Sequence, residues 1–309
     1  MVKKIKIYKN FKINKIHKNS VILIGNFDGL HSGHQKLFTH AQKYKKKLKL
    51  KMGVVTFDPI PRMFFNKNIR NYKISNFIQK INYFKKFEVD FLINKNFNKK
   101  FSKITCHKFI ENILSKELNV KYIFVSNNFR FGYKREGDVK LLKHCQSIYN
   151  YKLINPKPLK ENKKIISSTL IRKLLEKGYL DKANKFLTRK WTIEGRVEKG
   201  RMMGKKIGFP TCNINIGNYV IAKPGVYAVR VKIDKIKKIY KGIANLGYRP
   251  TFNQKKILLE VNLFNFSGNL YNKKLSVAFM RFIRGEKKFN EIDELRNQIK
   301  KDLFIAKKA

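Results

Sequence analysis

The pattern of apolar residues changes near position 188, and this change indicates two different folds within the chain. Before it, short apolar runs alternate with longer amphipathic stretches, which predicts strands alternating with helices. After it, the segments are short, alternating and bounded by turns, which predicts an antiparallel sheet or small barrel. A chain of 309 residues suits two domains. We therefore expect an α/β domain over residues 1–187 and a β-barrel domain with a terminal helix over residues 188–309.

The predicted elements of the first domain follow one another regularly. Strands are predicted over residues 20–26, 51–57, 89–94 and 120–126, and helices over 34–48, 76–87, 106–118, 138–149, 167–178 and 180–187. Such units join parallel strands through right-handed crossovers, so a parallel sheet is expected. In the second domain, strands are predicted over 192–199, 225–233, 239–246, 258–266 and 275–282, and an amphipathic helix over 291–304.

The chain is strongly basic, with a formal net charge of +51. Taken alone, this charge suggests a nucleic-acid partner. However, the lysines are spread over the whole chain and are joined by abundant Ile, Asn, Phe and Tyr, which share AT-rich codons. Genomic base bias is the simpler explanation, and we expect no specific nucleic-acid partner. The alternative is that the charge aids capture of anionic nucleotides or causes incidental RNA binding.

Cysteine usage and hydropathy indicate the cellular compartment and whether a metal site, disulfides or a membrane are involved. Cys106, Cys145 and Cys212 are scattered without a Cys-x-x-Cys pair, which argues against a zinc site or disulfide framework and favours a cytoplasmic protein. No stretch approaches 18 uninterrupted apolar residues, so no membrane association is expected. The basic start, residues 1–15, favours an entry strand over a signal peptide.

A glycine-bearing turn, GNFDGLHSGH at residues 25–34, follows the first predicted strand and opens the first predicted helix. Its glycines let the backbone turn tightly and approach a ligand. The helix N-terminus offers free N–H groups and a positive dipole end to a phosphate. In open parallel sheets, ligands bind at the carboxyl ends of strands, where this turn lies. The turn is therefore a candidate phosphate site.

Two histidines lie three residues apart in this turn, His31 and His34. From the first helical turn, both can face one phosphate, and imidazole N–H donors there can stabilise the charge that builds on a pentavalent α-phosphate. A single histidine would more often be an ordinary loop residue. The pair, placed after a buried strand and a glycine-rich turn, favours a catalytic role instead.

These residues resemble the His-x-Gly-His signature of the nucleotidyltransferase superfamily, in the form found in the prokaryotic bifunctional riboflavin kinase/FAD synthetase family. The resemblance implies a Rossmann-like nucleotidyltransferase domain with His31 and His34 as catalytic residues. It also implies ATP or flavin binding by the turn itself, through Gly25, Asn26, Phe27, Asp28 and Gly29.

Three further segments match the same family. ISSTLIR, residues 166–172, resembles the second superfamily signature and implies that Ser168 and Thr169 bind nucleotide while Arg172 clamps polyphosphate. TFDPIPR, beginning at residue 56, resembles a loop expected near flavin and includes Phe57. NFRFG resembles a turn in which its first residue, Asn128, would hold nucleotide or flavin.

The reaction implied for the first domain is adenylyl transfer, in which the phosphate of FMN attacks the α-phosphate of ATP and pyrophosphate leaves. Because the nucleophile is already an anion, positioning and charge neutralisation suffice and no general base is needed.

A second glycine-rich stretch, GRMMGKKIGFPTCN, covers residues 200–213. It lacks the Gly-Lys-Ser/Thr and the following helix of a Walker loop, so by itself it predicts only a flexible basic hairpin. It resembles the GxxxGxxxGFPTAN motif of riboflavin kinases. The resemblance implies nucleotide or flavin contacts from Gly204, Gly208 and Pro210, and a Mg²⁺ site at Thr211 and Asn213. Their oxygen atoms suit a hard cation.

LEVNL, residues 259–263, resembles the kinase strand that carries the general base. The resemblance makes Glu260 the group that takes the proton of the ribityl 5′-hydroxyl as the γ-phosphoryl group transfers. The pattern alone would make Glu260 an ordinary solvent-facing residue of an alternating strand. Asn262 stands where the family usually has His.

The expected function is a two-step synthesis from riboflavin to FMN and then to FAD, with ATP and Mg²⁺. The small molecules riboflavin, FMN and ATP are the expected partners, and self-association stays open. One alternative is that only one module is active. Another is a basic RNA-binding or aminoacyl-tRNA-synthetase-like protein, because class I synthetases share His-x-Gly-His. The sequence has no Lys-Met-Ser-Lys-Ser-like loop, which argues against the second alternative.

Overall fold

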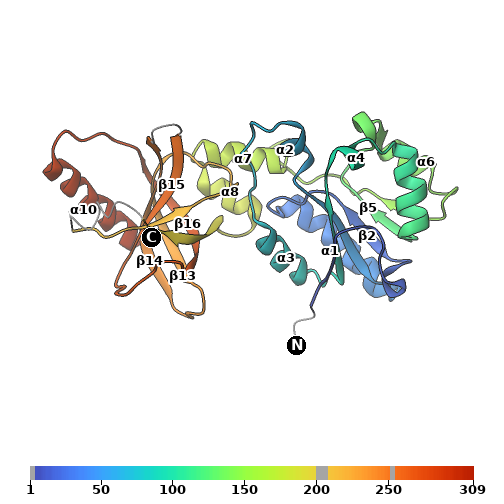
Figure 1. Ribbon diagram of the computed structural model, residues 1–309, viewed down its shortest axis with the longest axis horizontal. Coiled ribbons are helices and arrows are strands. Elements are labelled where there is room, and N and C mark those ends of the chain that lie inside the picture. The colour runs from blue at the N-terminus through green and yellow to red at the C-terminus, as the bar shows by residue number, and fades with distance from the viewer. Residues whose placement is uncertain (1–3, 200–207, 251–254) are drawn as a thin grey trace. The chain divides into compact units, whose positions relative to one another are not determined.

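The computed structural model describes residues 4–199, 208–250 and 255–309. The chain packs into two compact units (Figure 1). Unit 1 comprises Met1–Arg70 and Phe77–Ser167, and unit 2 comprises Asn71–Asn76 and Ser168–Ala309. The chain thus passes through unit 2 briefly before it returns to complete unit 1.

Unit 1 is built on a parallel sheet, as the alternation of elements predicted, and the sheet has six strands, of which β8 was not predicted. Its order is β1 (Lys6–Tyr8), β4 (Phe91–Asn96), β3 (Met52–Asp58), β2 (Val21–Ile24), β5 (Tyr122–Phe124) and β8 (Lys152–Ile154). The chain runs from β2 to β3 and β4 on one side, then crosses to β5 on the other side of β2. This reversal places a topological switch point at the carboxyl end of β2, where open parallel sheets bind ligands.

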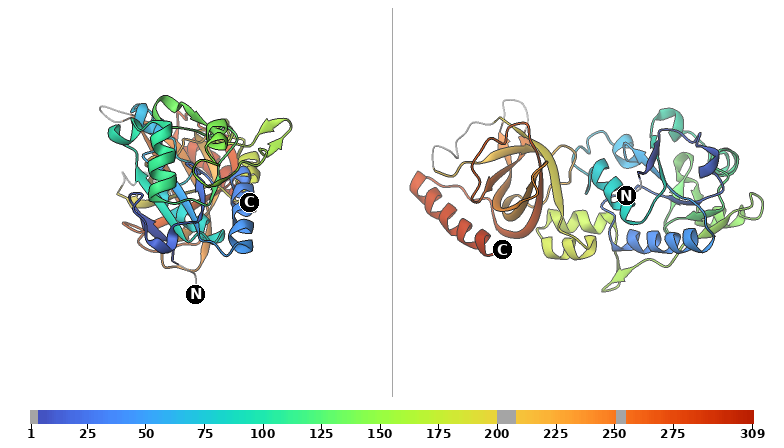
Figure 2. Two further views of the ribbon diagram at one scale, coloured as in Figure 1. Left: turned by 90° about the vertical axis from the view of Figure 1, so that its right-hand side faces the viewer. Right: turned by 90° about the horizontal axis from the view of Figure 1, so that it is seen from below.

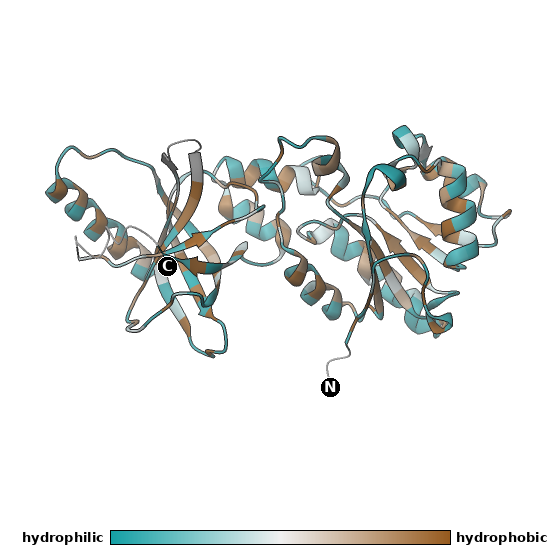
Figure 3. Ribbon diagram, in the orientation of Figure 1, coloured by the Kyte–Doolittle hydropathy of each residue, from teal (hydrophilic) through white to brown (hydrophobic). Residues whose placement is uncertain are grey.

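The central strand β2 explains why the sheet is covered on both faces. All four of its residues are buried. Since side chains alternate along a strand, Ile22 and Ile24 join the hydrophobic core on one face, while Val21 and Leu23 join the core on the other. Figure 3 shows the resulting contrast between apolar strands and helices of mixed polarity.

The connections of unit 1 are mainly helical. Its helices are α1 (Ser32–Lys47), α2 (Pro61–Phe65), α3 (Phe77–Lys86), α4 (Lys99–Ser102), α5 (Cys106–Lys108), a π-helical stretch Phe109–Glu117, and α6 (Val139–His144). Short 3-10 turns span Lys15–His17 and Tyr133–Arg135. Two small hairpins pair β6 (Arg130–Phe131) with β7 (Gly137–Asp138), and β9 (Lys160–Glu161) with β10 (Lys164–Ile165). The helix predicted over 138–149 is shorter than expected because the chain turns back after His144 and Asn150 takes a left-handed conformation with φ 51°.

Unit 2 is a closed antiparallel barrel with a terminal helix, as predicted. The barrel order is β11 (Thr192–Glu198), β12 (Cys212–Asn215), β15 (Lys255–Leu263), β14 (Ile239–Pro250), β13 (Gly225–Ile233) and β16 (Lys274–Gly285). Strand β12 was not predicted, because its four residues lie in a motif that looks like a loop. It closes the barrel between β11 and β15.

The terminal helix α10 (Ile292–Lys308) lies against the outside of the barrel, on β13 and β14 (Figure 2). One buried ion pair fastens it. Asp302 accepts from Arg284 of β16, with Nη2 to Oδ2 at 2.8 Å, and also from Gln298 of its own helix. An amphipathic helix with a single buried charge therefore completes the unit.

Two helices, α7 (Ser168–Glu176) and α8 (Leu180–Leu187), also belong to unit 2. Gly178, with φ 79°, ends α7 in the left-handed conformation expected of a C-terminal cap. Asn184 of α8 donates to the carbonyl of Phe279 in β16 and accepts from the backbone N–H of Trp191. The packing units therefore change at residue 168, while the predicted division of catalytic domains at residue 188 stays a prediction.

Candidate active sites

The turn after β2 holds a strained backbone. Phe27 and Leu30 have φ values of 45° and 36°, and Gly29 has φ 76°. A left-handed conformation costs a non-glycine residue about 1–2 kcal/mol. Burial offsets that cost, because Phe27 and Leu30 are 3% and 1% exposed, and the Phe27 ring packs edge-on against Phe38 with centroids 5.0 Å apart.

The turn leads directly into α1, whose N-cap residue is His31. The Nδ1 atom of His31 accepts from the backbone N–H of His34 at 3.4 Å. A neutral His31 therefore carries its proton on Nε2, which makes that atom a donor. The two imidazole rings stack with centroids 3.7 Å apart and planes 23° apart. Since the first turn of α1 contains no acidic residue, the helix end is suited to an anion.

Gly33 of α1 lies close to the backbone of Ile166. A Cβ atom at Gly33 would lie 3.1 Å from the carbonyl oxygen of Ile166 and 3.2 Å from Nδ1 of His31. A side chain there would therefore push the Ile166 backbone away. Ser168 and Thr169 follow two and three residues later along the chain, at the start of α7. The glycine of His-x-Gly-His thus lets the Ile166 backbone lie close to the start of α1.

Arg172, the predicted polyphosphate clamp, is buried in unit 2. Its Nε donates to the carbonyl of Tyr72 at 2.7 Å, and its guanidinium carbon lies 3.6 Å from the centroid of the Tyr72 ring. Tyr72 belongs to the segment 71–76 that joins unit 2. The guanidinium of Arg172 is therefore held beside Tyr72.

The other predicted residues of the first site have different surroundings. Asp28 is buried, at 2% exposure. Phe57, at the end of β3, packs against Phe101 with centroids 5.7 Å apart. Asn128 is exposed and accepts from the hydroxyl of Ser126 at 3.0 Å.

One residue of this region escaped prediction. Lys80 of α3 is only 7% exposed, and its ammonium donates to the carbonyl of Asn26 in the turn. Because the chain is rich in lysine, composition does not distinguish Lys80 from the other lysines. The available signal was its position: Phe77 and Phe84 lie three residues before and four after it, on the apolar face of the predicted helix.

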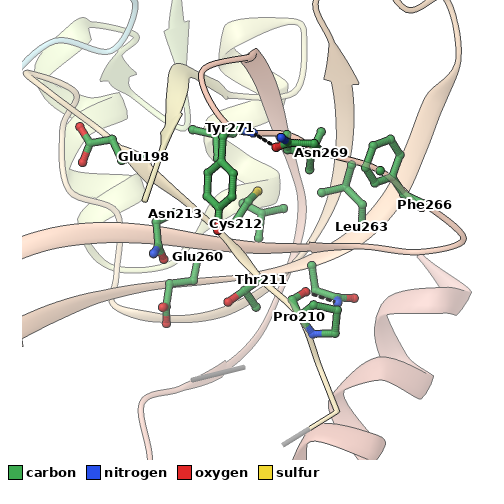
Figure 4. Close-up of a pocket in the computed structure, with 15 residues that line it drawn as sticks. Glu198, Pro210, Thr211, Cys212, Asn213, Glu260, Leu263, Phe266, Asn269 and Tyr271 are labelled. Carbon is green, nitrogen blue, oxygen red and sulfur yellow. Dashed lines mark hydrogen bonds between the residues drawn. The ribbon is translucent and has the colours of Figure 1, made fainter. Parts of the chain in front are cut away.

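The second site is a pocket of about 460 Å³ on the barrel, between β11, β12 and β15 (Figure 4). One part of its wall is polar, with Thr211, Asn213 and Glu260. Another part is apolar and aromatic, formed by Leu263, Phe266, Leu270 and Tyr271. Such a pocket can hold a ligand that has both a polar and an aromatic part.

The strand register brings the predicted residues together. Asn213 of β12 lies directly opposite Glu260 of β15, so their side chains leave the sheet on the same side. Asn213 is 8% exposed, and its Oδ1 atom is buried with no hydrogen-bond partner among the residues that the structure describes. An orphaned oxygen of this kind, next to a hydroxyl and a carboxylate, fits a site for a hard cation.

The segment before β12 is anchored by Asn262, whose Nδ2 donates to the carbonyl of Pro210 at 2.6 Å. Gly208 has φ 86°, a conformation that glycine adopts without strain. The predicted contact at Gly204 lies outside the described residues. In the sequence, Asn262 was noted only as a departure from the family. In the structure, it holds the carbonyl of Pro210, the residue before Thr211.

Cys212 lies between Thr211 and Asn213 and lines the pocket. Burial raises the pKa of its thiol to about 12. The thiol therefore stays protonated near neutral pH.

The parallel sheet with paired histidines at a helix N-terminus, together with an oxygen-lined barrel pocket holding a carboxylate, defines a two-module transferase of nucleotidyl and phosphoryl groups. Two family models match in the same order: FAD synthetase over residues 13–170 and riboflavin kinase over residues 187–309. The chain belongs to the bifunctional riboflavin kinase/FMN adenylyltransferase family.

Named relatives support this assignment over nearly the full length. The bifunctional riboflavin kinase/FMN adenylyltransferase of Buchnera aphidicola subsp. Schizaphis graminum is 40% identical over 96% of both chains. The enzyme of the same name from Escherichia coli K12 is 35% identical over 93% of this chain and 91% of its own length. A solved structure named macrolide-efflux protein, from Streptococcus pneumoniae, covers 99% of both chains at 29% identity with a TM-score of 0.85. Among the described residues, no helix is long and apolar enough to cross a membrane.

Proposed function

We propose that this chain makes FAD from riboflavin in two ATP-dependent steps, one in each module. The observation that carries the proposal is one pairing within a chain of this family: the stacked His31 and His34 at a helix N-terminus occur together with Asn213 opposite Glu260 in the barrel pocket. We assign residues 1–187 to FMN adenylyltransferase and 188–309 to riboflavin kinase, acting in the cytoplasm.

In the kinase step, the oxygen of the ribityl 5′-hydroxyl attacks the γ-phosphorus of ATP, and ADP leaves. The Glu260 carboxylate takes the proton of that hydroxyl. The aromatic part of the pocket, with Phe266 and Tyr271, would face the flavin ring or the adenine. Thr211 and Asn213 would hold Mg²⁺, which neutralises phosphate charge when bound. Gly204, Gly208 and Pro210 would line the phosphates.

In the adenylyl-transfer step, a phosphate oxygen of FMN attacks the α-phosphorus of ATP and pyrophosphate leaves. The Nε2–H of His31, together with His34, would donate to the α-phosphate as its negative charge grows. Backbone N–H groups at the start of α1 would share that charge. We further propose that Gly25–Gly29, Phe57, Asn128, Ser168 and Thr169 contact nucleotide or flavin, and that Arg172 binds phosphate.

Product analysis tests both steps at once. The chain is incubated with riboflavin, ATP and Mg²⁺, and flavins are separated over time by chromatography. FMN should appear first and FAD second. His31→Ala should abolish FAD formation and spare FMN formation, and Glu260→Gln should abolish FMN formation while FAD still forms from supplied FMN. No flavin turnover in the wild type, or equal loss of both activities in either variant, contradicts the proposal.

A further inference from the structure

A buried triangle of polar atoms joins the turn after β2 to strand β3 and helix α3. The Lys80 ammonium donates to the carbonyl of Asn26 at 3.1 Å and to the hydroxyl of Thr56 at 3.3 Å. The same hydroxyl donates to the carbonyl of Asn26 at 3.3 Å. Thr56 is fully buried and Lys80 is 7% exposed. A buried ammonium is costly unless it is hydrogen-bonded, and the Asn26 carbonyl and the Thr56 hydroxyl both accept from it.

The carbonyl of Asn26 is the point from which the strained turn departs. Directly after it, Phe27 and Leu30 adopt left-handed φ values, and His31 then caps α1. Each dihedral angle of a short turn sets the direction of the residues that follow. The orientation of the Asn26 peptide therefore affects the positions of His31 and His34 at the start of α1. Hydrogen bonds from a charged donor are stronger than neutral ones, so Lys80 holds that peptide more firmly than a neutral donor would.

We propose that Lys80 is a positioning residue of the adenylyl-transfer site, which holds the turn through the Asn26 carbonyl and thereby sets the places of His31 and His34. This proposal rests on the proposed adenylyl transfer at the same site. Lys80 acts through the turn and need not touch substrate, so its removal should impair the rate of the step more than the binding of ATP.

The test uses Lys80→Met, which keeps a long apolar stem and removes the ammonium, in the full chain. FAD formation from FMN should fall in kcat by about tenfold to a hundredfold, with KM for ATP nearly unchanged. Lys80→Arg should recover part of the loss. Lys85→Met is the matched control, since Lys85 is an exposed lysine of the same helix. FMN formation from riboflavin, measured on the same samples, should not change in any variant.

A spectroscopic measurement separates a positioning role from a merely structural one. The imidazole ¹H–¹⁵N signals of His31 and His34 should shift in Lys80→Met and stay in place in Lys85→Met. Unchanged signals together with a wild-type kcat overturn the proposal. If Lys80→Met does not fold, Thr56→Val decides: it removes the two bonds of the triangle that the Thr56 hydroxyl makes, and a wild-type kcat in that variant overturns the proposal.

The wild type separates this proposal from the proposed function. If the wild type forms FMN but never FAD, the assigned activity of the first site fails, and the histidine signals alone decide the role of Lys80. If the wild type forms FAD and Lys80→Met forms it equally fast, only the role of Lys80 fails.

Discussion

Asn213 of β12 lies directly across the ladder from Glu260 of β15, and its Oδ1 atom has no hydrogen-bond partner among the described residues. A buried amide oxygen without a hydrogen-bond partner costs free energy. A ligand that contacts this oxygen would remove the cost and bind more tightly for that reason. The pairing thus places the proposed cation ligand beside the proposed general base, within one pocket.

Asn213→Ala should raise the Mg²⁺ concentration at which FMN formation is half-maximal, by about tenfold or more, because one oxygen ligand is lost. FAD formation from FMN should keep its Mg²⁺ dependence, since the other module is untouched. Asn215→Ala serves as the control, because Asn215 is exposed at the end of the same strand. Titration of Mg²⁺ in the two assays measures both effects. Identical Mg²⁺ curves for Asn213→Ala and wild type would remove Asn213 from the cation site.

Asn262→Ala should lower kcat/KM for FMN formation by about fivefold, because the bond to the Pro210 carbonyl is lost and such a bond contributes about 1 kcal/mol. Asn262→His keeps a donor at this position and should recover much of the activity. Steady-state kinetics with varied riboflavin gives the comparison. An alanine variant as active as the wild type would show that the anchor is unimportant.

The raised pKa of Cys212 should make the protein lose stability in alkaline solution. Burial holds the thiol protonated up to about pH 12, whereas in the unfolded chain its pKa is near 9.0. Between these values the unfolded state binds fewer protons, so the free energy of unfolding falls as pH rises, by at most about 1.4 kcal/mol per pH unit from this group. Below pH 9 the contribution is fully present.

Urea unfolding at pH 8, 9, 10 and 11 measures this loss. Cys212→Ala lacks the thiol and should show a shallower decline than the wild type. Burial also raises the pKa of Tyr227 and of Tyr151, so some decline should remain in the variant. Parallel curves for the two proteins would mean that Cys212 ionises as readily in the folded state as in the unfolded chain.

Asp302→Asn should destabilise the docking of α10 on the barrel. Asp302 is almost fully buried and accepts from Arg284, and breaking a buried ion pair costs about 3–5 kcal/mol. Arg284 is partly exposed, so the lower end of that range is expected. Asp293→Asn on the same helix breaks an exposed pair with Arg296 and should cost at most about 1 kcal/mol. Thermal unfolding followed by circular dichroism compares the two, and equal melting temperatures would contradict the expectation.

Most elements could be predicted, because their signals are local. The apolar run that forms β2 and the amphipathic stretch that forms α10 can each be recognised from a short segment of sequence. The strand β12 could not be predicted. Its four residues, Cys212–Asn215, form a strand because β11 and β15 lie on either side of it, and neither neighbour is adjacent in the sequence.

The candidate sites divide in the same way. His31, His34 and Glu260 were expected from motifs, and their catalytic roles remain predictions. The roles of Lys80 and Asn262 became visible only through their partners, the carbonyls of Asn26 and Pro210. A lysine among many lysines and an asparagine on an alternating strand carry no local mark of such contacts.

Periodicity and motifs depend on neighbours along the chain, so the two modules, their order, the type of each sheet and the motif residues could all be read from the sequence. Which distant groups meet depends on the tertiary structure. The indole of Trp191 donates to the carbonyl of Ile74, 117 residues earlier, and Arg172 stacks on Tyr72 of the same segment. Residues 71–76 therefore belong to the barrel unit, although the strands and helices around them in sequence build the parallel sheet. The physical reason is burial. Apolar surface packs together to leave water, and the polar groups buried with it form hydrogen bonds with the groups that this packing places near them.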